Sequence, residues 1–316
     1  MFQIMEIVFI IIMIALLNST PTIASNNSVY AIGLEHELRL SPVIINLTKE
    51  TYFKSKLKLD TYFCGSFFNR KNKEFILVRN DPMTSVKIYR VDIKSDKLSK
   101  PYFEYYLNKN HLQYRQAIWS ESLQTLYIAS LKDNNKTRGV LLTILDFKNN
   151  TVKHIDLSKF ISIDKSIYTI NNRMLMIGYK TDIAAKKGHK PDSCIIIELG
   201  GLIVSNSNFN LNSMFVEGII DNAHIAVSDN NYLYSYDFVE LTKLIPRQTK
   251  INKIFGLLND NKCLYAQITQ SWVVAERDIL VSIPLNKPSK YTKLFKGENP
   301  WTISDSFIAN TDDIGF

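Results

Sequence analysis

Residues 122–157 constrain the fold of this chain more than any other stretch. An apolar run at residues 126–129 is followed by a polar turn at 132–138, a second apolar run at 140–145, and a third run that ends at Leu157. Short apolar and β-branched runs separated by clusters of Asn, Asp and Gly are typical of consecutive antiparallel strands. The stretch therefore predicts a β-meander, in which each strand pairs with the next.

The same pattern recurs along most of the chain. One inner strand of each unit can be marked by a central residue, and these residues are Ile76, Leu126, Met176, Ile225 and Leu264. They lie 50, 50, 49 and 39 positions apart. A period of about 40 to 50 residues with four strands per unit is that of a β-propeller, in which each sheet buries its two apolar faces against its neighbours. We therefore expect an all-β fold of four-stranded antiparallel blades.

The two ends of the chain predict how the ring closes. Residues 301–310 resemble the first two strands of a unit, because their apolar pattern matches that of residues 117–128. Residues 29–52 can supply the outer strands of the same blade. A blade shared between the termini removes two open sheet edges and brings the expected number of blades to six. The best candidate for a helix is a turn or two at residues 182–187.

The N-terminus has the features of an export signal. Residues 7–17 form an unbroken apolar run of eleven residues, which is the length of a signal-peptide core and short for a membrane span. Thr22 and Ala24 fit the rule of small residues before a cleavage site. We expect residues 1–25 to be a cleaved signal peptide and 26–316 to be one secreted propeller domain, with an uncleaved anchor as the alternative. No later stretch is long and apolar enough to be a transmembrane helix.

The strand phrases resemble those of a known group of propellers. Leu126-Tyr127-Ile128 and the stretch YLYSY at residues 232–236 are similar to strands of the TolB-like and LDL-receptor class-B group. The resemblance implies a six-bladed extracellular propeller and does not extend beyond the fold. The YWTD tetrapeptide of the class-B repeats is absent from every unit, as are the WD dipeptide and the glycine-rich kelch signature.

The chain is basic, with 38 Lys and Arg against 30 Asp and Glu and a net charge of +8. The tight basic cluster is Lys186, Lys187, His189 and Lys190, in an expected loop. Such a cluster is either a solvated loop or the binding site of an acidic ligand or anionic surface. We expect no nucleic-acid partner for a secreted chain, and we expect a monomer.

The sequence lacks the motifs of common catalytic sites. Its five histidines have no metal-ligand spacing to one another, and neither HExxH, GxSxG nor a phosphate-binding glycine loop occurs. We therefore predict no catalytic residue, no cofactor and no metal site. The histidines are His36, His111, His154, His189 and His224.

Carboxylates near expected strand ends leave one enzymatic alternative. Six-bladed hydrolases that resemble lactonases hold calcium at the channel mouth with Glu, Asp and Asn, since Ca²⁺ prefers six to eight oxygen ligands. The same residues are common in ordinary turns, where Asp forms local hydrogen bonds. The candidates are Glu35, Glu37, Asp81, Glu217, Asp221, Asp229, Asp312 and Asp313.

The cysteines and the glycosylation sequons give two further predictions about covalent chemistry. Cys64, Cys194 and Cys263 fall in different units, so we predict three buried free thiols rather than a disulfide. Four sequons are candidate glycosylation sites, and they begin at Asn26, Asn46, Asn135 and Asn149.

The repeat and the export signal together favour a binding protein. We expect a secreted, non-enzymatic propeller that binds an extracellular protein or glycan ligand. The alternative is a calcium-dependent esterase or lactonase with its site at the channel mouth.

Overall fold

The computed structural model describes most of the chain from residue 29 to residue 310. The described residues are 29–36, 40–46, 51–60, 62–69, 72, 74–81, 84–92, 97–107, 112–120, 122–133, 138–187, 189–207, 209, 214–220, 223–246, 251–258, 263–271, 276–294 and 303–310. The expected signal peptide lies outside them.

Nearly all of the regular structure is β-strand. The short helix α2 (Asp182–Lys186) begins after Thr181, whose hydroxyl accepts a hydrogen bond of 3.3 Å from the Ala184 amide. The helix lies within the range expected from the sequence. In chain order the strands are β1 (Val29–His36), β2 (Leu40–Asn46), β3 (Thr51–Lys54), β4 (Phe63–Asn69), β5 (Glu74–Asp81), β6 (Ser85–Asp92), β7 (Lys97–Leu98), β8 (Phe103–Tyr106), β9 (Leu112–Ser120), β10 (Thr125–Asp133), β11 (Arg138–Asp146), β12 (Thr151–Asp156), β13 (Ile163–Ile170), β14 (Arg173–Tyr179), β15 (Ser193–Glu198), β16 (Ile203–Asn206), β17 (Phe215–Ile219), β18 (Ile225–Ser228), β19 (Tyr232–Tyr236), β20 (Leu241–Pro246), β21 (Ile251–Leu258), β22 (Cys263–Ser271), β23 (Glu276–Pro284), β24 (Thr292–Lys293) and β25 (Ile303–Asn310).

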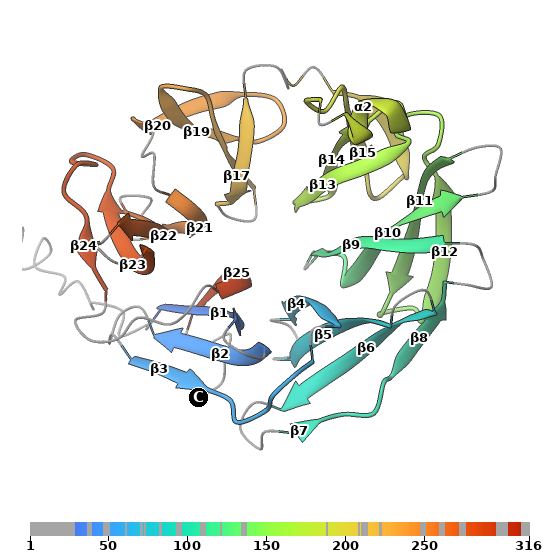
Figure 1. The fold of residues 1–316 in the computed structure, drawn as a ribbon, viewed down its shortest axis with the longest axis horizontal. Coiled ribbons are helices and arrows are strands. Elements are labelled where there is room, and N and C mark those ends of the chain that lie inside the picture. The colour runs from blue at the N-terminus through green and yellow to red at the C-terminus, as the bar shows by residue number, and fades with distance from the viewer. Residues whose placement is uncertain are drawn as a thin grey trace, which may run out of the picture.

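The described strands form antiparallel sheets arranged around a common centre (Figure 1). In order around the ring, the first sheet is β25-β1-β2-β3, the second β4-β5-β6-β7 with β8 also on β6, the third β9 to β12, the fourth β13 to β16, the fifth β17 to β20 and the sixth β21 to β24. The innermost strands are β25, β4, β9, β13, β17 and β21. The fold is thus the all-β propeller of four-stranded antiparallel blades expected from the repeat. Each residue that marks the repeat lies on the second strand of its sheet, counted from the centre.

The first sheet joins the two ends of the chain. Its innermost strand β25 pairs antiparallel with β1, from Val29 opposite Asn310 to Glu35 opposite Ile303. Residues 301–310 were expected to form two strands, and this prediction is wrong, because residues 303–310 form one strand and the N-terminal segment forms three. The expected division fell at Ser306, but Asp305 and Ser306 together lie opposite the single residue between Ile32 and Leu34 of β1, which makes a bulge in β25.

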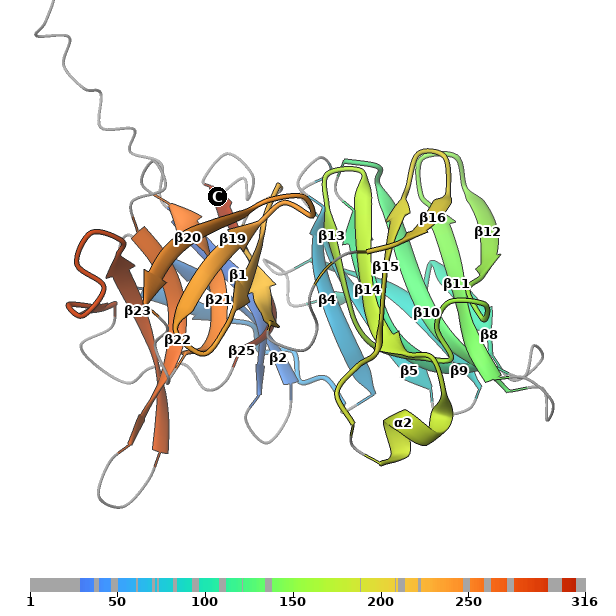
Figure 2. The same cartoon turned by 90° about the horizontal axis from the view of Figure 1, so that it is seen from above.

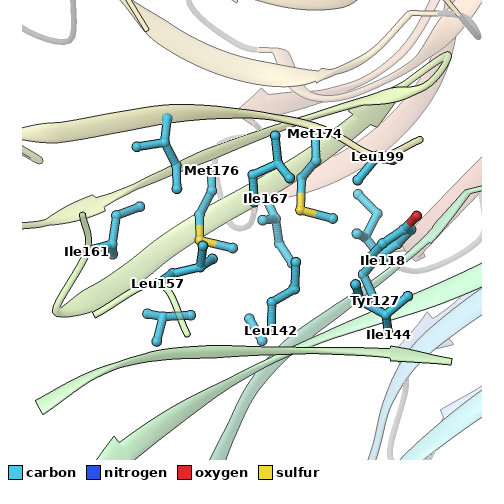
Figure 3. Close-up of a cluster of buried hydrophobic side chains, with 14 residues drawn as sticks. Ile118, Tyr127, Leu142, Ile144, Leu157, Ile161, Ile167, Met174, Met176 and Leu199 are labelled. Carbon is cyan, nitrogen blue, oxygen red and sulfur yellow. The ribbon is translucent and has the colours of Figure 1, made fainter. Parts of the chain in front are cut away.

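Large apolar cores fill the space between neighbouring sheets. Between the third and fourth sheets, fourteen buried side chains interdigitate, among them Leu142, Met174 and Met176 (Figure 3). They come from both sheets because alternate residues of a strand face opposite sides. The expected burial of both faces of each sheet is clear in β10, where Leu126, Tyr127, Ile128 and Ala129 are all buried.

Candidate functional site

The molecule has two different ends. Helix α2 connects β14 to β15 and lies at the lower edge of Figure 2. We call this the α2 end. The antiparallel order puts the β9–β10, β11–β12 and β15–β16 turns at the opposite end, which we call the turn end. Strand β13 begins at the α2 end, because Ile163 pairs with Tyr179 at the end of β14. Strand β9 also begins there, because Leu112 pairs with Lys132 near the end of β10.

The innermost strands carry β-bulges. Strands β4, β9, β13 and β17 each have one register shift against the second strand, so that one extra residue is inserted. Bulges bend a strand and redirect its side chains, and they are common at barrel rims and beside functional sites. In β9 and β13 the shift lies in the first half of the strand and therefore toward the α2 end. The inserted residues are Cys64, Arg115, Lys165 and Glu217.

The bulges of β9 and β13 meet in a charged cluster. The Asp164 side chain is 1% exposed, and its Oδ1 lies 3.5 Å from Nε of Arg115. Gln116 Nε2 donates to Asp164 Oδ2, and Arg115 Nη2 donates to the Asp164 carbonyl at 3.2 Å. The Arg115 side chain is 42% exposed. The pair therefore joins two neighbouring sheets and leaves part of a guanidinium exposed to solvent.

The bulge of β17 carries a carboxylate. Ser228 Oγ donates to Oε1 of Glu217. Across the boundary with the fourth sheet, burial raises the pKa of Tyr168, and the charge of Glu217 raises it further while a hydrogen bond with Ser166 opposes the shift. Glu217 is therefore held by a hydroxyl of its own sheet and lies within electrostatic reach of the next one.

The basic cluster predicted from the sequence lies at the α2 end. Lys186, Lys187, His189 and Lys190 are all exposed. Lys190 reaches the fifth sheet, where its Nζ lies 5.6 Å from the ring centroid of Phe215 on the innermost strand β17. The Lys190 side chain therefore reaches the innermost strand of the neighbouring sheet.

The calcium-ligand candidates do not converge among the residues whose side chains are described. Asp81, in the second sheet, contacts Lys87 at 2.7 Å and Arg79 at 3.2 Å. Asp229, in the fifth sheet, accepts hydrogen bonds from the backbone of its own turn and from the Tyr234 hydroxyl. Within the described part of the chain, no group of three or more His, Cys, Asp and Glu could hold a metal ion. Glu35 is placed on β1 by its backbone alone, and Glu37, Asp221, Asp312 and Asp313 lie outside the described residues.

The histidines are dispersed. His154 is exposed on β12, with its Nδ1 3.2 Å from the Thr143 hydroxyl. His224 is half-buried just before β18, and His189 belongs to the basic cluster. His36 is placed on β1 by its backbone only, and His111 lies outside the described residues.

Cys194 and Cys263 are free thiols in the part of the chain that the structure describes. Cys194 is 7% exposed, and burial raises the pKa of its thiol to about 11, against a smaller opposing effect of a hydrogen bond with Ser207. Cys263 is free but only half-buried, so the prediction of a buried thiol is wrong there. The reason is its position as the first residue of β22, where the strand leaves the core. The Cys64 side chain lies outside those described.

The sequons differ in accessibility. Asn149 is exposed in the β11–β12 turn, whereas Asn46 at the end of β2 is 7% exposed. Asn26 and Asn135 lie outside the described residues.

The structure contains one site that the sequence did not predict. A groove of about 480 Å³ opens at the turn end between the third and fourth sheets. The groove is formed by the β9–β10, β11–β12 and β15–β16 turns, which the sequence does not show to be neighbours. The residues that line the groove are Ser122, Leu123, Gln124, Thr125, Tyr127, Ile144, Asp146, Lys148, Asn149, Thr151, Lys153, Leu199, Gly200 and Leu202.

Comparisons with known proteins support the fold alone. No family model matches the chain, and no curated protein matches it. Among solved structures, TolB from Acinetobacter baumannii is similar with a TM-score of 0.57 and 12% identity over 89% of this chain and 66% of that one. The acylaminoacyl peptidase of Pyrococcus horikoshii has a TM-score of 0.52 and 12% identity over 86% of this chain and 45% of that one. The resemblance to TolB-like propellers at the level of the fold is confirmed. The described part of the chain contains no helix long and apolar enough to span a membrane.

Proposed function

We propose that this protein is a secreted, non-enzymatic propeller that binds an acidic segment of an extracellular protein at its α2 end. The observation that carries the proposal is the gathering of basic groups there. The exposed Lys186, Lys187, His189 and Lys190 and the exposed side chain of Lys165, on the innermost strand β13, share this end of the molecule. A concentration of one sign of charge speeds encounter with a partner of opposite charge and orients it.

Neighbouring carboxylates are already engaged, which supports the same conclusion. Asp164 is bound by Arg115 and Gln116, and Glu217 accepts from Ser228. In the second sheet Asp81 is neutralised by Arg79 and Lys87. These three carboxylates are held within the fold, whereas Lys186, Lys187 and Lys190 are exposed at this end.

The proposal is tested with a defined probe. A fluorescent ten-residue polyglutamate peptide is titrated with the mature protein and its anisotropy is measured at two salt concentrations. We expect Lys186→Ser combined with Lys187→Ser to weaken binding about tenfold. The matched control is Lys287→Ser combined with Lys290→Ser, which removes two exposed charges from the β23–β24 turn at the other end. Equal losses in both double variants would show that only net charge matters.

Two further arms separate the alternatives. Tight binding of a sulfated glycan, with no binding of the peptide, would make a glycan the ligand. Hydrolysis of a lactone or simple ester that requires calcium and is abolished by a chelator would favour the calcium-dependent hydrolase. A sulfated glycan is anionic and would use the same basic loop, so the missing peptide binding is what separates the two ligands. The hydrolysis assay does not involve the loop.

The export and closure of the ring are part of the proposal. We infer that residues 1–25 are removed, that residues 26–316 act as a monomer, and that the six sheets are the blades of one closed ring. Deleting residues 303–316 removes β25 and exposes an edge of β1, so the protein should lose most of its stability. A deletion variant that unfolds at the same temperature as the full chain contradicts the closure. The mass of the secreted protein, expected to begin at residue 26, tests the cleavage.

A further inference from the structure

The groove at the turn end is a built cavity separate from the proposed protein-binding face. Its volume of about 480 Å³ is in the range of small-molecule sites, which are 300–1,000 Å³. Its lining includes the buried Tyr127 and Ile144 from the third sheet, and the buried Leu199 and half-buried Leu202 from the β15–β16 turn of the fourth. Such a surface offers apolar contact beside hydrogen-bonding groups, the combination that binds a sugar ring.

The turns around the groove are fixed in place. Gln124, Asn150 and Leu202 have φ values of 52°, 52° and 55°, a left-handed conformation that non-glycine residues adopt at an energetic cost. The Phe147 amide donates to the Gln124 carbonyl at 3.2 Å, which ties the β11–β12 turn to the β9–β10 turn. The Leu199 amide donates to the Asn172 carbonyl at 2.8 Å. The groove is therefore largely preformed, which lowers the entropic cost of binding.

The carboxylate in the groove is already occupied. Asp146 Oδ1 accepts the amides of Lys148 and Asn149 at 2.9 and 3.0 Å, and Oδ2 accepts Asn149 Nδ2 at 2.7 Å. Partial desolvation opposes ionisation, but these hydrogen bonds outweigh it and lower the pKa of Asp146. The carboxylate therefore stays ionised and directed at its own turn, where it shapes the wall.

Two lysines supply the remaining charge of the lining. Lys148 is exposed in the turn, and Lys153 is exposed on β12. Alternation along β12 places Thr151, Lys153 and Ile155 on one face, and Ile155 packs against the core between the third and fourth sheets. Lys153 therefore faces the fourth sheet across the groove. Among the lining residues, two ammonium groups stand against one carboxylate that is bound within its turn.

We propose that this groove binds a sugar acid of one ring, such as a hexuronate. The carboxylate of the ligand pairs with Lys148 and Lys153, and its ring hydroxyls bond to Gln124 and Thr151. The C–H face of the ring packs on Leu202. Asn149 begins a sequon at the rim, so a glycan attached there would compete for the same space.

The experiment uses the unglycosylated mature chain from a bacterial host and D-glucuronate as the probe. A ligand-observed NMR titration should show saturable binding of glucuronate and at least tenfold weaker binding of D-glucose and of acetate. Lys148→Gln combined with Lys153→Gln should weaken glucuronate binding at least tenfold. The control Lys159→Gln removes an exposed charge of the third-to-fourth sheet connection at the α2 end and should change nothing. Loss of binding in that control, equal binding of acetate, or no saturation by glucuronate each overturns the proposal.

A second measurement does not rely on variants. Amine acetylation followed by mass spectrometry should show that glucuronate protects Lys148 and Lys153 while Lys159 is modified at an unchanged rate. Equal modification of all three lysines with and without glucuronate also overturns the proposal. Since the groove and the α2 end are tested with different probes, either proposal can fail alone.

Discussion

The boundary between the third and fourth sheets differs in kind from the boundary between the fourth and fifth. The first is filled by fourteen buried side chains that are almost entirely aliphatic or Met, with Tyr127 as the aromatic member (Figure 3). The second is filled by nine, including Phe209, Tyr236 and Phe238. The strands of the third and fifth sheets also differ in length: β10 and β11 have nine residues each, whereas β18 has four and β19 five.

The polar links follow the packing. Strands β9 and β13 are joined near the centre by Arg115, Gln116 and Asp164, and by Thr169 Oγ1, which donates to the Trp119 carbonyl at 3.0 Å. Between β13 and β17 the ribbons are farther apart (Figure 1). The aromatic rings of this boundary come from β19 and the neighbouring connections, where a large side chain spans more distance than an aliphatic one. We infer that the boundary between the third and fourth sheets is the more stable of the two. The fifth sheet should therefore be the first to separate from its neighbour and unfold.

The largest expected effect tests the two cores directly. Ile195→Ala removes a fully buried side chain from the aliphatic core, and Ile225→Ala removes one from the aromatic core. Ile→Ala substitutions in cores cost about 2–5 kcal/mol, with the larger cost where the surroundings cannot collapse. The aliphatic core lies between longer strands, so we expect it to collapse less around the cavity. The free energy of unfolding in urea should therefore fall further for Ile195→Ala than for Ile225→Ala. A larger loss for Ile225→Ala would reverse the ranking of the two boundaries.

The next largest effect is expected for the polar cluster of Arg115, Gln116 and Asp164, which joins β9 to β13. Asp164→Ala leaves the Gln116 amide without its carboxylate partner, and loss of a buried hydrogen-bond partner costs about 1–3 kcal/mol. Arg115 is partly exposed and regains water, which keeps the cost below that of a fully buried pair. Asp164→Asn, which retains an acceptor, should lose less. Equal urea midpoints for wild type and both variants would show that the cluster contributes nothing to the boundary.

A smaller effect is expected at the outer side of the fifth sheet. Arg173 Nη2 donates to the Asp237 carbonyl at 2.8 Å, and its guanidinium lies 5.5 Å from the Phe238 ring centroid. Phe238 has a φ of 74°, so this turn is held in a conformation that a bulky residue rarely adopts. Arg173→Gln should lower the free energy of unfolding by about 0.5–1.5 kcal/mol and speed amide exchange in β19 and β20. Faster amide exchange in β10, with none in β19 and β20, would contradict this prediction, because Arg173 would then stabilise the third sheet rather than the fifth.

The repeat explains how much of this fold was predictable. The five marker residues each fell on the second strand of a sheet, because an apolar strand between turn residues is a local pattern. The C-terminal strand was divided wrongly at Ser306, into residues 301–305 and 307–310, since a bulge and a turn have the same polar residues.

The candidate sites were less predictable for a physical reason. The loop at residues 186–190 was found because its charges are contiguous in sequence. The pairing of Arg115 with Asp164 and the groove beside Lys153 depend on residues from different units, and nothing in one sequence reports which side chains face each other across two sheets. Cys263 shows the same limit, since a strand's first residue can be inside or at the rim.

The smallest expected effect is the pH dependence contributed by Cys194, which lies in the aromatic core. Burial raises the pKa of its thiol from an ordinary value near 9 to about 11, so the folded state favours the protonated form. The unfolded chain loses this proton first as pH rises, so the contribution to stability is fully present below pH 9 and is lost between 9 and 11. Between pH 8 and 9.5 wild type should lose on the order of 0.5–1 kcal/mol more than Cys194→Ala, which has no thiol to titrate. Parallel pH profiles for the two proteins would mean that the unfolding of the fourth–fifth boundary does not expose this thiol. Labelling with a thiol reagent gives an independent reading, because half-buried Cys263 should react in the native protein and Cys194 only after that boundary opens.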